Sequence, residues 1–330
     1  MLDHPLGVKI MKSLDKIKER RVIFGMALFE TIAPIFLIIL LGCSIKQARL
    51  FKDEFFVEAN RFVYYFSLPV LIFTGVAKSG LHSFSFALIL SAVLPTVAVF
   101  FIGCCIGRIA GLRGGRFGTF VQGTYHGNVS YIGLAVVFYM LGEDAFRQGS
   151  IIVGFLVLTT NLLSSIILSI AASASERHAV RPLVSIAKNP VIISSVAGIC
   201  VAYLGLPMPA LVMKSMAVLA NIALPLALIT IGASLTLASA RTSWRLGLLI
   251  CFMKLVFLPG LAIGLVKMLG LPLGYASTSI ILLATPVATL AYIMAGQLGG
   301  DGELASNSVT LSTALSLFTY MGWAVVLGLG

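Results

Sequence analysis

The sequence predicts an all-α integral membrane protein with ten transmembrane helices. Of its 330 residues, 59% are hydrophobic and only 11% are charged, whereas a soluble domain carries about 25% charged residues. The apolar runs approach the ~20 residues that a helix needs to cross a hydrocarbon core, and they lack the ~10-residue alternating segments of a membrane barrel. The net charge of +11 comes from Lys and Arg that lie mostly between the apolar runs. There they orient a membrane protein, so the charge does not indicate a nucleic-acid partner.

A basic N-terminal extension, residues 1–26, precedes the apolar runs; it holds six Lys and Arg but no run of spanning length. We expect it to be a disordered or interfacial tail, or a segment upstream of a natural start at Met26. Residues 46–58, after the first run, interleave charges with Leu and Phe, as in a short amphipathic surface segment or a solvated helix extension. The predicted spans are 27–45, 60–77, 84–107, 117–141, 146–172, 189–205, 211–238, 245–268, 273–298 and 304–329.

Proline pairs recur at one offset along the chain. Pro34 and Pro190 are 156 residues apart, and so are Pro69 and Pro225. Several pairs at a nearly constant offset indicate an internal duplication. Each half holds five spans, and an odd number makes the second half enter the membrane from the opposite side. The result is a 5+5 inverted repeat, which is the build of many secondary transporters.

The duplication divides the chain into a first repeat at 27–172, a linker at 173–188 and a second repeat at 189–330. Loops on the linker side carry 12 Lys and Arg, and loops on the opposite side carry four. Cytoplasmic loops are the more basic ones, so we expect the linker to be cytoplasmic and both termini to be extracytoplasmic. The six basic residues of the extension oppose this orientation.

Spans 4 and 9 contain residues that interrupt a helix. Residues 123–133 include three glycines, a histidine and an asparagine, and each glycine in a helix interior costs about 1 kcal/mol relative to alanine. Residues 284–288 include Pro286, which removes a helix hydrogen bond. Interrupted spans in corresponding halves point to the binding site of a transporter. We therefore expect two broken helices that cross and direct their N-terminal ends, which attract anions, at one cavity.

The expected substrate-binding residues lie around the two interruptions. The repeat alignment places Asn128 opposite Thr285 and Val129 opposite Pro286. Asn128 has two donors and an acceptor, enough to satisfy freed backbone and to hold a carboxylate. The alternative is a pair of kinked helices with a purely structural role. The full predicted set is Tyr125, His126, Gly127, Asn128, Ser130, Asn161, Lys254, Thr285, Pro286 and Thr289.

Two residues of this set can carry a charge. His126 could titrate near neutral pH and couple transport to protons, or it could be a neutral imidazole that is hydrogen-bonded to loosened backbone. Lys254 lies about 4 Å from the middle of its apolar run, where an ammonium costs at least ~2.5 kcal/mol. It either binds a substrate carboxylate or neutralises the carbonyl end of a helix.

Other residue patterns limit the function. There is no Ser/His/Asp set, no HExxH and no phosphate-binding GxxxxGK[ST] motif, so we do not expect an enzyme. The five cysteines show no spacing of a metal site or a disulfide framework, and we expect no metal and no cofactor. The series Gly103, Gly107 and Gly111, and the pair Gly260 and Gly264, are spaced for close helix packing.

Motifs in order along the chain resemble the auxin efflux carrier family. The resemblance covers residues 27–330 and implies the ten-span inverted repeat, related to bile acid/sodium symporter-like folds. The short linker is similar to that of bacterial members and implies a bacterial inner membrane. The motifs are Ala33-Pro34-Ile35-Phe36-Leu37 with Gly42, Ser67-Leu68-Pro69, Gly127-Asn128 with Ile132-Gly133, Asn189-Pro190, Ala223-Leu224-Pro225 with Gly232-Ala233-Ser234-Leu235, Lys254-Leu255 with Pro259, and Ala284-Thr285-Pro286.

The resemblance also implies a mechanism. Spans 1, 2, 6 and 7 would form a scaffold and a homodimer face, and spans 3–5 and 8–10 a core that moves small mono- or dicarboxylates across the lipid bilayer by an elevator-type motion. The alternative is a channel or receptor-like sensor that uses the same fold without alternating access. Family members often carry proline shortly after the span-4 Gly-Asn, whereas Ala135 occupies that region here. Glycines must therefore supply the first interruption.

Overall fold

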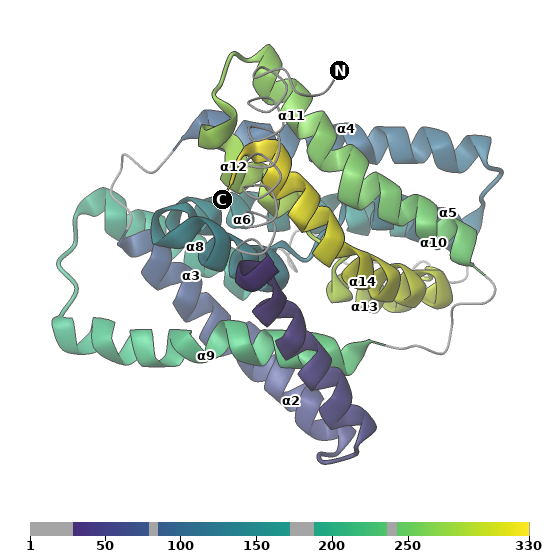
Figure 1. Cartoon of the computed structure of the whole chain (residues 1–330). Coiled ribbons are helices and arrows are strands. Elements are labelled where there is room, and N and C mark those ends of the chain that lie inside the picture. Colours follow the sequence, from purple (N-terminus) through teal and green to yellow (C-terminus); the bar gives the residue numbers. More distant parts are fainter. Residues whose placement is uncertain (1–28, 79–84, 172–187, 236–242, 330) are drawn as a thin grey trace, which may run out of the picture.

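The computed structural model describes residues 29–78, 85–171, 188–235 and 243–329, and these residues form helices joined by short connections (Figure 1). Within the described ranges the only strand-like pairing is a single bridge between Gly127 and Val287. The all-α prediction is confirmed for this part of the chain. The predicted extension 1–26 and the linker 173–188, apart from Lys188, lie outside the described residues.

The helices of the first half follow the predicted apolar runs. Residues 46–58 contain the end of the first helix, a turn and the start of α2, and both alternatives, an amphipathic surface segment and a solvated helix extension, are compatible with this helix. Pro69 has no N–H to donate, and the turn before it is the wider π-helix η1. The elements are a first helix at Phe29–Gln47, α2 (Asp53–Phe62), η1 (Val63–Ser67), α3 (Leu68–Ala77), α4 (Phe86–Ile109), α5 (Gly114–Tyr125), η3 (Val129–Gly133) and α6 (Leu134–Ala171).

The second half contains a similar series. A π-helical turn, η4, again precedes a proline, Pro259. The elements are α8 (Pro190–Leu204), α9 (Ala210–Ser234), α10 (Trp244–Phe252), η4 (Met253–Phe257), α11 (Leu258–Met268), α12 (Leu273–Leu283), α13 (Thr289–Gln297) and α14 (Gly302–Leu327).

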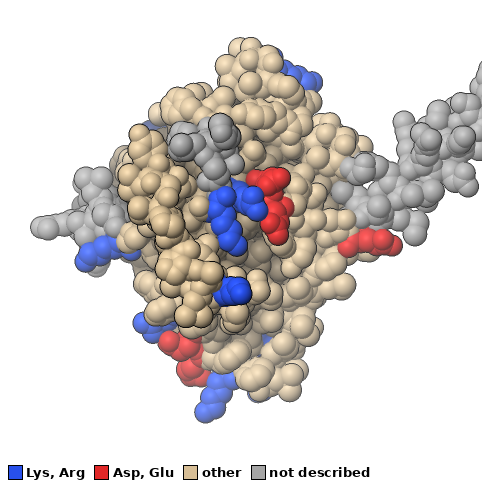
Figure 2. Space-filling model, turned by 90° about the vertical axis from the view of Figure 1, so that its left-hand side faces the viewer, with Lys and Arg blue, Asp and Glu red and all other residues tan. Residues whose placement is uncertain are grey.

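Several of these segments have the length and composition of membrane spans. Two further apolar helices, α8 and α12, are shorter, with 15 and 11 residues. Figure 2 shows a face that consists mostly of uncharged residues, with the few charged side chains gathered in small groups of both signs, as expected of a protein with a lipid-facing surface. The six segments in the described ranges that are long and apolar enough to cross a bilayer are Phe29–Gln47, Phe86–Ile109, Val129–Ala171, Ala210–Ser234, Trp244–Met268 and Gly302–Leu327.

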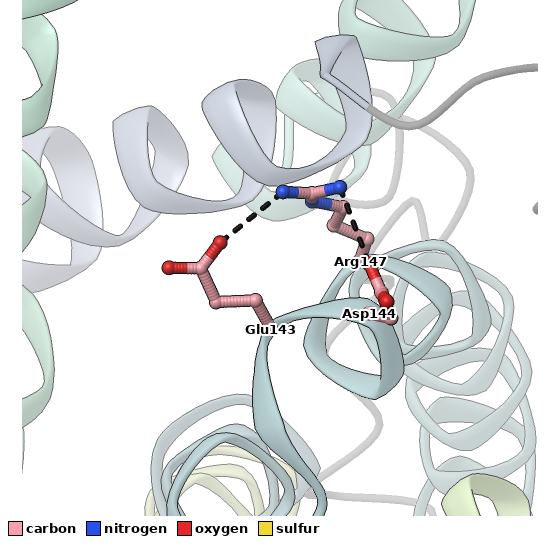
Figure 3. A network of polar contacts seen from close by, with 3 residues as sticks. All are labelled: Glu143, Asp144 and Arg147. Atoms are coloured by element: carbon pink, nitrogen blue, oxygen red, sulfur yellow. Dashed lines mark hydrogen bonds and ion pairs between the residues drawn. The ribbon is translucent and has the colours of Figure 1, made fainter.

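Helix α6 bends at Gly142, at the junction of the predicted fourth and fifth spans. Gly142 has φ +85°, a left-handed conformation that glycine adopts at no steric cost. Arg147, one turn later, pairs with Glu143 at 3.1 Å and with Asp144 at 3.3 Å (Figure 3). Because both carboxylates are largely exposed, these ion pairs add little stability.

The first helix crosses α9 at very close range. A Cβ atom added to Gly42 would overlap the backbone of Ile229, and one added to Gly232 would overlap the backbone of Ile39. Two glycines on opposing helices therefore let the two backbones touch, as in small-residue helix packing in membranes. In Figure 1 the first helix and α9 cross at one end of the molecule, near α2 and α3.

The glycines of α4 that were predicted to allow close helix packing do so in part, and those of α11 do not. Gly103 packs on Thr124 and Gly107 on Phe117, so α4 and α5 approach closely. Gly111 has φ +69° and faces open space, because it ends the helix instead of packing. The prediction for Gly260 and Gly264 is wrong: Gly264 has no neighbouring atom within 4 Å and Gly260 only touches Trp323 at 3.7 Å, since this face of α11 is turned away from the neighbouring helices.

Candidate functional site

Two interrupted helices meet at one point, which we call the crossover. Helix α5 ends at Tyr125 and α12 ends at Leu283, and in both segments non-helical backbone follows. The Asn128 N–H donates to Pro286 O at 2.8 Å, and the Ala288 N–H donates to His126 O at 2.9 Å. Each segment thus satisfies backbone groups of the other, which buried backbone at membrane depth requires. The predicted interruptions are confirmed.

The local sequence explains why the segments can approach. A Cβ atom on Gly127 would overlap Thr285 Oγ1 and would lie 2.8 Å from both Cε and Nζ of Lys254. Glycine is therefore required at this position for the two backbones and the lysine to fit together. The Val287 N–H donates to Ser312 Oγ of α14 at 2.9 Å, which satisfies a further group of the second segment.

The hydrogen bonds of the crossover set its register, which the repeat alignment did not address. The alignment makes Asn128 and Thr285 corresponding positions of the two repeats, and in the structure Asn128 pairs with Pro286 while the bridge joins Gly127 to Val287. The first interruption spans three residues between helices, 126–128, and the second spans five, 284–288. Because the second interruption is longer, the constant offset between corresponding residues of the two repeats does not hold within it.

Asn128 and Thr289 stand at the N-terminal ends of the helices that leave the crossover. Asn128 caps η3, since its Oδ1 accepts from the Tyr131 N–H at 3.3 Å. Thr289 is the first residue of α13, which has no side-chain cap. Both ends present N–H groups that lack partners within their own helix, and the partial positive charge at each end favours an anion.

Lys254 lies against the same crossover. Its side chain is 1% exposed, and Nζ donates to Leu283 O at 2.6 Å and contacts Thr285 Oγ1 at 3.4 Å. Leu283 is the last residue of α12, so the ammonium neutralises the carbonyl end of a helix, the second of the two roles open from the sequence. Among the ion pairs of the described residues, none includes Lys254.

His126 and Tyr125 share one partner that the sequence did not reveal. Ser164 Oγ of α6 lies 2.8 Å from His126 Nδ1 and 3.0 Å from the Tyr125 hydroxyl. All three side chains are buried. The hydrogen bond of the imidazole therefore goes to a side-chain hydroxyl and not to loosened backbone as expected. The serine has one proton and cannot donate to both neighbours, so it orders the three groups into a chain of hydrogen bonds.

Asn161, Ser130 and Thr289 are partly exposed, unlike the remaining predicted site residues. Asn161 lies one turn before Ser164, on the same face of α6, and α13 packs against α6. Asn161 Oδ1 and Thr289 Oγ1 are buried polar atoms with no hydrogen-bond partner among the described residues. Such atoms are uncommon in native structures and call for an explanation, for example a bound ligand.

The predicted residues thus fall into two layers. Tyr125, His126, Lys254 and Thr285 form the buried layer together with Gly127, Asn128 and Pro286, and the partly exposed layer is Ser130, Asn161 and Thr289. A small gap between α4 and α6 includes none of these residues; it is lined by Ser85, Leu88, Ile89, Gln148, Ile151 and Ile152. The crossover is the candidate site, because the lining of that gap carries no charged side chain.

Sequence reasoning missed Ser164 and Ser312. Ser164 follows Asn161 by three residues, the spacing of neighbours on one helix face, and this signal could have indicated it. Ser312 adjoins Thr313, which is also buried, and nothing in the sequence distinguishes the two hydroxyls. Only the rotation of α14 decides that Ser312 meets Val287.

Helical segments of spanning length and a buried crossover of two interrupted helices define a multi-pass membrane transporter. Residues 27–324 match the family described as Membrane transport protein. The chain belongs to this family, the auxin efflux carrier and membrane transport family that its motifs resemble.

Three relatives support this assignment. A protein of Rhizobium meliloti (strain 1021) named "Putative malonate transporter" is 28% identical over 308 residues, which cover 88% of this chain and 93% of the relative. An uncharacterized transporter of Methanothermobacter thermautotrophicus is 25% identical over 305 residues, 90% of this chain and 98% of the relative. An uncharacterized transporter of Methanocaldococcus jannaschii is 20% identical over 305 residues, which again cover 90% of this chain and 98% of the relative. Family and relatives indicate a transporter and not an enzyme.

Proposed function

We propose that this chain is a secondary transporter of small organic anions that holds a substrate carboxylate at the crossover. The observation that carries the proposal is the pairing of the two interruptions through Asn128 and Ala288. This pairing brings the N-terminal ends of η3 and α13 to one place. N-terminal helix ends supply N–H donors and partial positive charge, the chemistry that recognises a carboxylate.

Three groups at the crossover favour an anion. Lys254 has no carboxylate partner among the described residues, so no fixed anion there would repel a bound carboxylate. The Thr289 hydroxyl has no hydrogen-bond partner there and is free to donate. The Asn128 side-chain carbonyl is used as a helix cap, which leaves its amide N–H₂ for a ligand.

The substrate class is a small mono- or dicarboxylate. The Rhizobium meliloti relative bears malonate in its name, and malonate is therefore the first compound to test here. Its two carboxylates could contact the two helix ends together. His126 Nδ1 is already bonded to Ser164, so a contact of His126 with the substrate would use Nε2.

The proposed architecture is a ten-span 5+5 inverted repeat with elevator-type alternating access. Packing is compatible with two bodies: α3 packs mainly on α8 and α9, α4, α5 and α6 pack on one another, and α12 packs on α4, α6 and α14, while α6 also contacts α3 and α8. The first group would be the scaffold and homodimer face and the second the moving core. Both termini would lie outside the cytoplasm in a bacterial inner membrane.

The test is uptake by purified protein in proteoliposomes, with a panel of malonate, succinate, acetate, indole-acetate and uncharged malonamide. The pH gradient and the membrane voltage are varied separately. We expect saturable uptake and counterflow of at least one carboxylate and no uptake of malonamide. Unsaturable flux would instead indicate a channel, and binding without flux a sensor on the same fold.

A further inference from the structure

The C-terminal end of α12 offers an arrangement of oxygen atoms that suits a small cation. Leu283 O is the last helical carbonyl, and Thr285 Oγ1 lies beside it. The Thr285 hydroxyl donates its proton to Leu282 O at 3.0 Å, so the free lone pairs of the oxygen are available to a cation. Carbonyl and hydroxyl oxygens are ligands of hard cations, and C-terminal ends of broken helices bind coupling ions in other transporters.

In this chain a lysine occupies that position. Lys254 Nζ lies 2.6 Å from Leu283 O and 3.4 Å from Thr285 Oγ1. Gly127 leaves the space that the lysine fills, since a Cβ there would lie 2.8 Å from both Cε and Nζ. The neighbours of Lys254 along the turn, Met253 and Leu255, are buried and apolar, so water does not compete for the ammonium.

We propose that the Lys254 ammonium is a tethered cation that replaces a diffusible monovalent coupling ion at the crossover. It follows that binding and transport of the anion require neither Na⁺ nor K⁺. This proposal rests on the proposed transport function, but the site itself does not depend on the identity of the substrate.

Charge balance supports a single cation at this place. The Leu283 and Thr285 oxygens are neutral, as are the carbonyl ends that hold monovalent coupling ions in other transporters, and no carboxylate of the described residues pairs with Lys254. With the lysine present, a second cation would meet an ammonium without a compensating anion. The substrate carboxylate would supply the compensating charge.

The first experiment measures thermal stability in detergent and needs no substrate. Lys254→Ala should leave a cavity lined by Leu283 O and Thr285 Oγ1, and Na⁺, K⁺ or ethylammonium should raise its melting temperature by about 2–4 °C relative to choline at equal ionic strength. Lys254→Met refills the cavity with an apolar side chain and should not respond. Wild type and Lys267→Ala, which removes an exposed lysine of α11, should not respond either. A Lys254→Ala protein that folds but is indifferent to these cations would overturn the proposal.

The second experiment uses the wild-type protein and stands even if Lys254→Ala does not fold. Malonate uptake into proteoliposomes should be equal in Na⁺, K⁺ and choline media, whereas loss of a coupled ion would reduce it about 5- to 150-fold. Saturable uptake that requires Na⁺ would refute the proposal that Lys254 replaces a coupling ion, but it would support the proposed transport function. No uptake of any carboxylate, together with cation-dependent stability of Lys254→Ala, would refute the transport proposal and support the tethered cation.

Discussion

At the scale of single residues, the crossover is made from an amide, hydroxyls, one ammonium and a glycine. Among the described residues none of its side chains is a carboxylate, and Lys254 is the residue there that can carry a positive charge without an ion-pair partner. Ser164 holds His126 and Tyr125 in one hydrogen-bonded chain, and Ser312 holds the backbone of Val287. Burial strengthens such bonds and also makes each lost partner costly.

Gly127 should be the least replaceable residue of the crossover. Gly127→Ala places a methyl group on Thr285 Oγ1 and against Lys254, and overpacking of this kind costs about 1–3 kcal/mol. We expect a clear loss in melting temperature of the purified protein. Gly264→Ala is the matched control, because no atom lies within 4 Å of that added methyl. Equal stability of the two variants would show that the backbones at the crossover are not in contact as described.

Asn128→Asp separates the capping role of Asn128 from its proposed role in binding. The carboxylate keeps an oxygen to accept from the Tyr131 N–H and favours the helix N-terminus, so the folded protein should persist. The Asn128→Asp side chain has no N–H₂ donor and its negative charge repels an anion. We therefore expect the affinity for malonate to fall at least about tenfold. Binding measured by calorimetry, with melting temperature as the folding control, tests this. Unchanged affinity would remove Asn128 from the site.

At the scale of the elements, two features decide how the helices are placed. The interruptions of α5 and α12 satisfy each other's backbone, and glycines let helices approach where they cross. Tyr131, which follows the first interruption, donates to Asn60 Oδ1 of α2 at 3.2 Å. This contact links the crossover to the helices of the proposed scaffold, and any motion of one body against the other must break it.

The crossing of the first helix and α9 makes a prediction at this scale. Gly42→Leu would drive a large side chain into the backbone of Ile229 and should separate the two helices. We expect the free energy of unfolding to fall by about 3 kcal/mol or more. Gly274→Leu is a control at a position with open space around it. Expression level and detergent melting temperature report the difference. If Gly42→Leu behaves like its control, the two backbones do not touch in the folded protein.

Much of the helical layout could be predicted from the sequence, because apolar length and helix-breaking residues are local signals. The runs 84–107 and 211–238 became α4 (Phe86–Ile109) and α9 (Ala210–Ser234), and both interruptions lie where glycines and Pro286 placed them. The partners of Lys254 and His126 could not be predicted, since they depend on how helices far apart in the chain are rotated. The register of the crossover could not be predicted either, because it depends on the lengths of the two interruptions, which differ.

At the scale of the whole molecule, charge is concentrated in two kinds of place. Ion pairs such as Arg147 with Glu143 and Asp144 lie at the surface, and Lys254 lies alone at the crossover. The other buried polar side chains of the described residues, such as Gln122 and Asn307, are uncharged. Under the proposed function an anion would reach the crossover from the side of the partly exposed Ser130, Asn161 and Thr289.

The measurement that tests the central claim most directly is a cryo-EM map of the protein with a saturating carboxylate substrate. We expect ligand density within hydrogen-bond distance of the Asn128 amide and the Thr289 hydroxyl, between the N-terminal ends of η3 and α13, and we expect it to be absent from the Asn128→Asp protein. Ligand density at another site, or density that is unchanged in the variant, would contradict the claim that the crossover binds the substrate.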